Sequence, residues 1–228
     1  MIGRVVLMAE MHGRDLIRRH AALGLLIALP LSFYLASAGG DRRAPVNGGI
    51  GMAFAVSGAS LFSIMSARAV DQRLVLAGYR PVELLLGRLG FLGPLALALA
   101  GVFTALMARL SSPTRIGVVA LGLAAVALQA VPFGLAVGAA VPRELEGVLA
   151  VIGVIGVQLA TESGTVVSKV LPFYGPKRII EAGLEHEGAL LTPLVHTIVY
   201  GLVLLIVARV LISQRVYVRK AQVPDTVA

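Results

Sequence analysis

The sequence predicts an all-α integral membrane protein with six transmembrane helices, an N-terminal amphipathic interfacial helix and a re-entrant outer segment between spans five and six. Of the 228 residues, 57% are apolar and 14% are charged, and the mean hydropathy is +0.89. These values exclude a water-soluble domain of this length. Little sequence is left for a second domain, so we expect residues 1–228 to form a single transmembrane domain. Six runs lack Asp, Glu, Lys and Arg, and they cover residues 20–40, 44–67, 89–108, 116–142, 147–161 and 188–208.

The six runs differ in length. Five contain at least 20 residues, enough for a helix to cross a hydrocarbon core of about 30 Å. The run 147–161 contains 15 residues, or about 22 Å of helix, so the fifth span must admit charge or stop early. Residues 1–20 are longer than the basic start of an ordinary signal peptide, so we expect residues 21–38 to be a retained first span.

The basic residues predict the orientation. With the N-terminus inside, the inner segments carry 13 of the 20 Lys and Arg residues and the outer loops carry 7. Because short cytoplasmic loops accumulate positive charge, we expect a multi-pass protein of the cytoplasmic (inner) membrane with both termini cytoplasmic. The net charge of +8 would be typical of a nucleic-acid-binding protein if the chain were soluble. Here the basic residues lie between apolar runs, so we expect no nucleic acid partner.

Residues 1–19 predict an amphipathic helix on the inner membrane surface. At 100° per residue the basic side chains lie outside one apolar arc of about 120°. The basic face suits the anionic inner leaflet, and an ordinary solvated helix with a basic flank is the alternative. The arc contains Ile2, Val5, Val6, Ala9, Gly13, Leu16 and Ile17.

Residues 67–84 predict a second inner element, a short charged helix. Gly78 can end this helix with a positive φ angle, and Pro81 fits the first turn of the next helix. A tight turn would connect two spans equally well, so a helix here points to a partner. A plain connecting loop is the alternative.

Residues 162–187 predict the re-entrant outer segment, because Pro172, Gly175 and Pro176 interrupt it. Irregular backbone at membrane depth occurs only where it is buried in protein or faces a watery cavity. A plain extracellular loop is the alternative.

The order of these elements resembles the permease subunits of type-2 ABC exporters over nearly the whole chain. Those proteins share six spans, an N-terminal connecting helix, outer re-entrant helices, and a charged helix with the pattern seen here as Asp71, Gly78 and Pro81. The resemblance implies export of an amphipathic or lipid-like molecule by alternating access. It also implies a second permease copy or a homologous permease as partner, contact with membrane lipid, and a separate ABC ATPase subunit that binds ATP and Mg.

A soluble ATPase can move a membrane protein only by gripping rigid cytoplasmic elements, and 1–19 and 67–84 are the inner segments long enough to be gripped. The cytoplasmic tail 214–228 is expected to be disordered past Lys220. We expect Asp71 and Arg73 to pair with charges on the ATPase, and Leu74 and Tyr79 to fill an apolar groove as buried anchors. The full set of expected coupling residues is Arg68, Asp71, Gln72, Arg73, Leu74, Tyr79 and Arg80.

The chain itself carries no motif for chemistry. It lacks a P-loop, so we expect no ATPase activity in this polypeptide and no cofactor. It lacks Cys, its four His residues show no metal-ligand spacing, and no G-x-S-G sequence supports intramembrane proteolysis. An ion- or proton-coupled secondary transporter is the first alternative, which should display paired intramembrane carboxylates or inverted repeats. A non-transporting scaffold is the second.

Two polar residues within or beside the spans, Gln129 and Glu162, are candidates for the translocation path. A bond from Gln129 to a neighbouring helix is an equal alternative. The spacing of Gly134 and Gly138 predicts close helix packing.

Overall fold

The structure is a computed structural model that describes residues 2–18, 20–37, 43–111, 113–162, 164–185 and 189–220. The expected disordered tail beyond Lys220 lies outside these residues. Over the described ranges every regular element is a helix. The helices are α1 (Ile2–Arg18), α2 (His20–Leu35), α3 (Ala44–Ser66), α4 (Arg68–Leu76), α5 (Pro81–Leu110), α6 (Ile116–Ala140), α7 (Glu144–Ala160), α8 (Val166–Val170), α9 (Tyr174–Leu184) and α10 (Leu191–Lys220).

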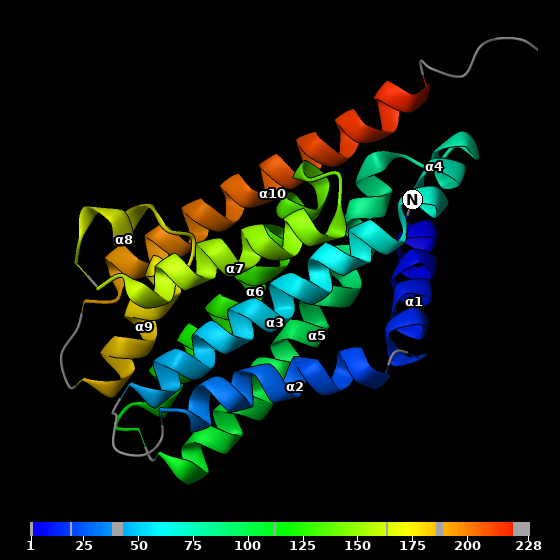
Figure 1. The fold of residues 1–228 in the computed structure, drawn as a ribbon. Coiled ribbons are helices and arrows are strands. Elements are labelled where there is room, and N and C mark those ends of the chain that lie inside the picture. Colours follow the sequence, from blue (N-terminus) through cyan, green and yellow to red (C-terminus); the bar gives the residue numbers. More distant parts are fainter. Residues whose placement is uncertain are drawn as a thin grey trace, which may run out of the picture.

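The long helices form a bundle with two different ends (Figure 1). Helices α3, α5, α6, α7 and α10 run along the bundle. At one end, which we call the α4 end, lie α1, α4 and the C-terminal part of α10. At the other end, the α9 end, lie α8 and α9. Helix α1 crosses the start of α5 instead of continuing along the bundle.

Four helical segments are long and apolar enough to cross a membrane: Ala44–Ser66, Pro81–Leu110, Ile116–Ala140 and Leu191–Arg215. Helices α2 and α7 have 16 and 17 residues, about 24 and 26 Å, which falls short of a hydrocarbon core of about 30 Å. The expectation of an all-helical fold is confirmed for the described residues, and four of the six predicted spans are helices of spanning length.

The boundaries of two helices differ from those of the charge-free runs. Helix α5 begins at Pro81, eight positions before the run that predicted it, and α10 continues to Lys220. Charges are tolerated inside α5 because they are paired: the Glu83 carboxylate accepts the Arg80 backbone N–H at 2.9 Å, and Arg88 pairs with Asp71. Within the segment 67–84, the predicted short helix is present as α4 (Arg68–Leu76). Gly78 follows it with a φ of 89°, and Pro81 starts α5.

The core centres on the crossing of α3 and α6, where glycine allows the backbones to touch. A Cβ atom on Gly134 would lie 2.1 Å from the Ser57 carbonyl oxygen, and one on Gly138 would lie 3.0 Å from the Leu61 carbonyl oxygen. The Ser57 hydroxyl donates to the Ala130 carbonyl at 3.2 Å. The predicted small-residue packing is confirmed.

Helix α9 packs into the bundle among α3, α6 and α10. Its Ile179 and Ile180 are 0% and 1% exposed. Ile180 occupies the space that a side chain on Gly122 of α6 would need, since a Cβ there would lie 2.5 Å from Ile180 Cγ1. The segment between α8 and α9 is buried as well, and Phe173 meets Phe133 edge to face at 5.5 Å between ring centroids.

Candidate functional site

The α4 end begins with α1, whose register on α5 is set by a glycine. Met8 is 2% exposed and lies over Gly87, where a Cβ would come within 2.6 Å of the Met8 Cβ. One turn further along α5, a Cβ on Gly13 would lie 3.1 Å from Cε2 of the Phe91 ring. Of the predicted apolar arc, Ala9 and Gly13 lie against α5 together with Met8, which is outside the arc, and Val6 is 59% exposed. Neighbouring α5 supplies pockets for some side chains and not others, which an apolar arc alone cannot reveal.

Arg4 joins α1 to the turn between α4 and α5. Its Nη1 donates to the Gly78 carbonyl at 3.2 Å, and its guanidinium lies 4.9 Å from the centroid of the Tyr79 ring. The same Nη1 lies 3.9 Å from the Glu83 carboxylate. A cation over an aromatic face and a donor on a turn carbonyl both restrict this turn. Helix α1, the turn and the start of α5 thus form one unit.

Asp71 connects α4 to α5 through a buried ion pair. Arg88 Nη2 donates to both carboxylate oxygens of Asp71, at 2.9 and 2.7 Å. The Asp71 side chain is 11% exposed and the Arg88 side chain is 1% exposed. Burial raises the pKa of Asp71 above its ordinary value, and the charge and hydrogen bond of Arg88 act in the opposite direction. Asp71 was expected to pair with a charge on an ATPase, but the structure gives it a partner within the chain.

Two further arginines satisfy the C-terminal end of α6. Arg68 donates to the carbonyls of Pro142 and Val141, the latter at 2.6 Å. Arg215 of α10 donates to Gly138 at 3.3 Å and also to Val141. The last carbonyls of a helix lack intrahelical partners and carry a partial negative charge, so cations are favourable there. These bonds tie α4, α6 and α10 together, around a cavity of about 280 Å³ that Gln72 and Arg88 also line.

The outward face of α4 and the following turn combines charge with apolar side chains. Arg73 and Arg80 are exposed, and Leu74 and Tyr79 are half-buried. Leu76, which the sequence analysis did not single out, is 65% exposed. We call Arg73, Leu74, Leu76, Tyr79 and Arg80 the α4 surface. Among the expected coupling residues, Arg68 and Asp71 make contacts inside the chain, Gln72 lines the smaller cavity, and the Tyr79 ring also meets the Arg4 guanidinium.

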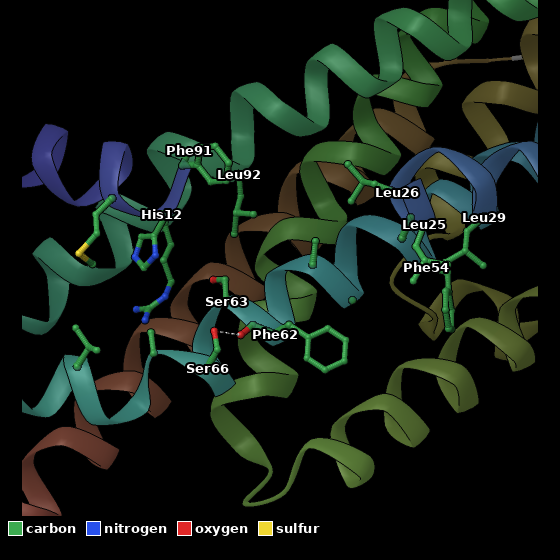
Figure 2. A pocket seen from close by; sticks show the side chains of 17 residues that line it. His12, Leu25, Leu26, Leu29, Phe54, Phe62, Ser63, Ser66, Phe91 and Leu92 are labelled. Carbon is green, nitrogen blue, oxygen red and sulfur yellow. Dashed lines mark hydrogen bonds between the residues drawn. The ribbon is translucent and has the colours of Figure 1, made fainter. Parts of the chain in front are cut away.

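A larger cavity of about 540 Å³ lies beside this assembly, among α1, α2, α3 and α5. Figure 2 shows its two ends: His12, Ser63, Ser66 and Phe91 lie toward one end, and Leu25, Leu29 and Phe54 toward the other. The walls are mostly apolar. Arg88 lines this cavity as well as the smaller one, so it stands between them.

The two residues expected on a translocation path lie apart from both cavities. Gln129 is 2% exposed and donates to the Pro172 carbonyl in the α8–α9 connection, and Gln158 accepts the Phe173 backbone N–H at 3.2 Å. The alternative for Gln129 was a bond to a neighbouring helix, and the bond that the structure contains goes to the connection between two helices. Glu162 is exposed near the α9 end, and its carbonyl accepts the Thr165 hydroxyl at 3.3 Å.

Comparison with known proteins adds no assignment, because the chain matches no family model and no curated protein. Over the described ranges, no group of three or more His, Asp and Glu side chains could hold a metal ion.

Proposed function

We propose that this chain is the transmembrane subunit of an ATP-binding cassette exporter. A separate ATPase subunit would bind the α4 surface, and a second permease copy or a homologous permease would complete the transporter. The observation that carries the proposal is that α1, α4 and the start of α5 are joined by packing, a hydrogen bond and an ion pair at one end of four helices of spanning length. A soluble ATPase needs such a binding surface to transmit force to the membrane helices, whereas a protein that is only held in the membrane does not.

The contacts at the α4 end offer a route for force. Displacement of α4 is passed to α5 by the Asp71–Arg88 pair and to α6 by Arg68. Displacement of α1 is passed to α5 by Met8 on Gly87. Since packed helices move as rigid bodies, closure of two ATPases would rock several helices together and open the dimer interface outward. The cargo would be amphipathic or lipid-like.

The proposal includes the full topology: six spans, both termini cytoplasmic, and a re-entrant α8–α9 segment in the outer leaflet. It is supported by the gathering of α1, α4 and the end of α10 at one end, and by the burial of Phe173 and Ile179 at the other. Helices α2 and α7 would cross with their ends in the headgroup region.

Single-cysteine labelling tests this topology, since the chain has no cysteine of its own. A reagent that cannot cross the membrane should label exposed cysteines at Thr114 and Glu185 in intact cells. It should label cysteines at Arg73 and Glu144 only after the cells are lysed. The reverse pattern contradicts the proposed orientation.

Coupling is tested by removing apolar anchors from the α4 surface. Truncation of a buried interface anchor costs about 2 kcal/mol or more, and about 1.4 kcal/mol is a factor of ten in affinity. Leu76→Ala and Tyr79→Ala should therefore release the ATPase or uncouple ATP hydrolysis from export in reconstituted vesicles. Leu145→Ala is the matched control, because Leu145 is 70% exposed at the start of α7, also at the α4 end. Wild-type coupling in all three variants would contradict the docking assignment.

A further inference from the structure

We infer that the cavity among α1, α2, α3 and α5 binds a single-chain anionic amphiphile, with its anionic group at Arg88 and its chain along α3. This goes beyond the proposed transport function, because such binding requires no ATPase and no second copy. A long-chain carboxylate is the simplest molecule of this class.

The dimensions of the cavity fit one chain. Its lining on α3 and the residue that follows this helix extends from Phe54 to Ala67, which is about 13 steps of about 1.5 Å, or about 20 Å. A volume of about 540 Å³ spread over this length gives a mean cross-section of about 27 Å². That is room for one alkyl chain, and the volume lies within the range of small-molecule sites.

The cavity opens to the outside of the bundle. Leu25 of α2 and Phe62 of α3 both line it, and they are 58% and 42% exposed. In a chain embedded in a bilayer this opening faces lipid, so an amphiphile can enter from the membrane. In Figure 2 the polar side chains His12, Ser63 and Ser66 lie toward one end, together with Phe91, while the lining at the other end is apolar. Ser66 is the last residue of α3, directly before α4, so the end with the polar side chains is the α4 end. A headgroup at the interface and a chain toward the bilayer centre match this order.

The polar end offers hydrogen-bond donors that are buried and unused. Arg88 is 1% exposed, and its Nη2 binds Asp71, but its Nε and Nη1 have no partner among the described residues. The Ser63 hydroxyl in the same lining is also unpartnered there. Buried donors without acceptors are costly.

The chemistry of these donors selects an anion. A guanidinium has only donors, in a planar fork that matches two oxygens of one acceptor group. Both oxygens of Asp71 are already held by Nη2, so the carboxylate is not available to a cationic headgroup. A carboxylate or phosphate oxygen at Nε and Nη1 would satisfy the remaining donors with charge-assisted hydrogen bonds.

Fluorescence quenching can measure the binding, because the chain contains no tryptophan. Phe62→Trp places a single reporter in the cavity lining, and Leu149→Trp places one on the 57% exposed face of α7 outside it. The purified chain is placed in nanodiscs of zwitterionic lipid. A brominated long-chain carboxylate is the probe, and its methyl ester is the uncharged control. We expect saturable quenching of the Phe62→Trp reporter only, with the ester binding at least about ten-fold more weakly.

A cavity-filling substitution gives an independent test. Gly58 lines the cavity, and a Cβ there meets nothing within 4 Å, so Gly58→Leu should fill part of the space while Asp71 and Arg88 themselves are kept. Gly101→Leu is the matched control, since Gly101 also has open space but lies outside the lining. Gly58→Leu should weaken probe binding at least about ten-fold, and Gly101→Leu should leave it unchanged.

Three results would overturn the inference. Equal binding of acid and ester would mean an apolar groove with no role for Arg88. Absence of saturable quenching would mean that water satisfies the donors. If Gly58→Leu binds the probe as the unsubstituted chain does but changes the oligomeric state, a second copy covers the opening. None of these results bears on ATPase docking, which the coupling experiment tests separately.

Discussion

Replacement of Gly134 by alanine should separate the two central helices. A Cβ at this position would lie 2.1 Å from the Ser57 carbonyl oxygen and 2.8 Å from its carbonyl carbon. Ordinary contacts are about 1 Å longer, so α3 and α6 must move apart by a similar amount. Overpacking of this kind costs about 1–3 kcal/mol, while Gly→Ala within a helix gains up to about 1 kcal/mol of propensity. The net effect is destabilisation by up to about 2 kcal/mol.

The matched control is Gly101→Ala on α5, where a Cβ meets nothing within 4 Å. This variant keeps the propensity gain and avoids the clash, so its change should have the opposite sign. Reversible unfolding in mixed micelles measures both free energies. Adding Ser57→Ala should not rescue Gly134→Ala, because the clashing oxygen belongs to the backbone. Equal stability of the Gly134 and Gly101 variants would refute the close crossing of α3 and α6.

Three further predictions concern buried polar groups. Arg88→Met should destabilise the fold by about 3–5 kcal/mol at neutral pH, because it leaves the Asp71 carboxylate uncompensated, and the double variant with Asp71→Asn should recover part of this in the same unfolding assay. The Asp71 pKa is raised above 3.8 on folding, so the unfolded chain loses this proton first as pH rises. The free energy of unfolding of the wild-type chain, relative to that of Asp71→Asn, should therefore fall as the pH rises from 3.8 to the folded-state pKa. If unfolding measured across this pH range shows no such fall, the burial of Asp71 is contradicted. Gln129→Leu leaves the Pro172 carbonyl without its donor and should lower the free energy of unfolding by about 1–3 kcal/mol. A cysteine at Phe173 should be labelled faster in the Gln129→Leu background, and an unchanged labelling rate would count against the bond.

Sequence reasoning succeeded where the signal was local. Gly78 and Pro81 predicted the end of α4 and the start of α5, since positive φ and a missing N–H are properties of single residues. The 15-residue charge-free run predicted a short fifth helix, and α7 ends at Ala160. The glycine spacing at Gly134 predicted close packing in the same way.

The contacts that build the candidate site were not predictable in this way, because their partners are far apart in the chain. Asp71 and Arg88 are 17 positions apart, and Arg215 lies 77 positions from Gly138, whose carbonyl it binds. Periodicity assigns each arginine to a helix but not to a partner. Arg88 directly precedes the charge-free run 89–108, which placed it at the edge of a span and did not indicate its partner.

The central claim is that an ATPase binds the α4 surface. The most direct measurement is to place a photo-crosslinking side chain at Arg73, purify the chain from its own membrane in mild detergent, and identify the crosslinked polypeptides by mass spectrometry. Exposed Val166 at the α9 end is the control position. The account predicts a crosslink from position 73, and none from position 166, to a polypeptide that carries a P-loop and hydrolyses ATP. Recovery of no such polypeptide, or its attachment to position 166, would contradict the account.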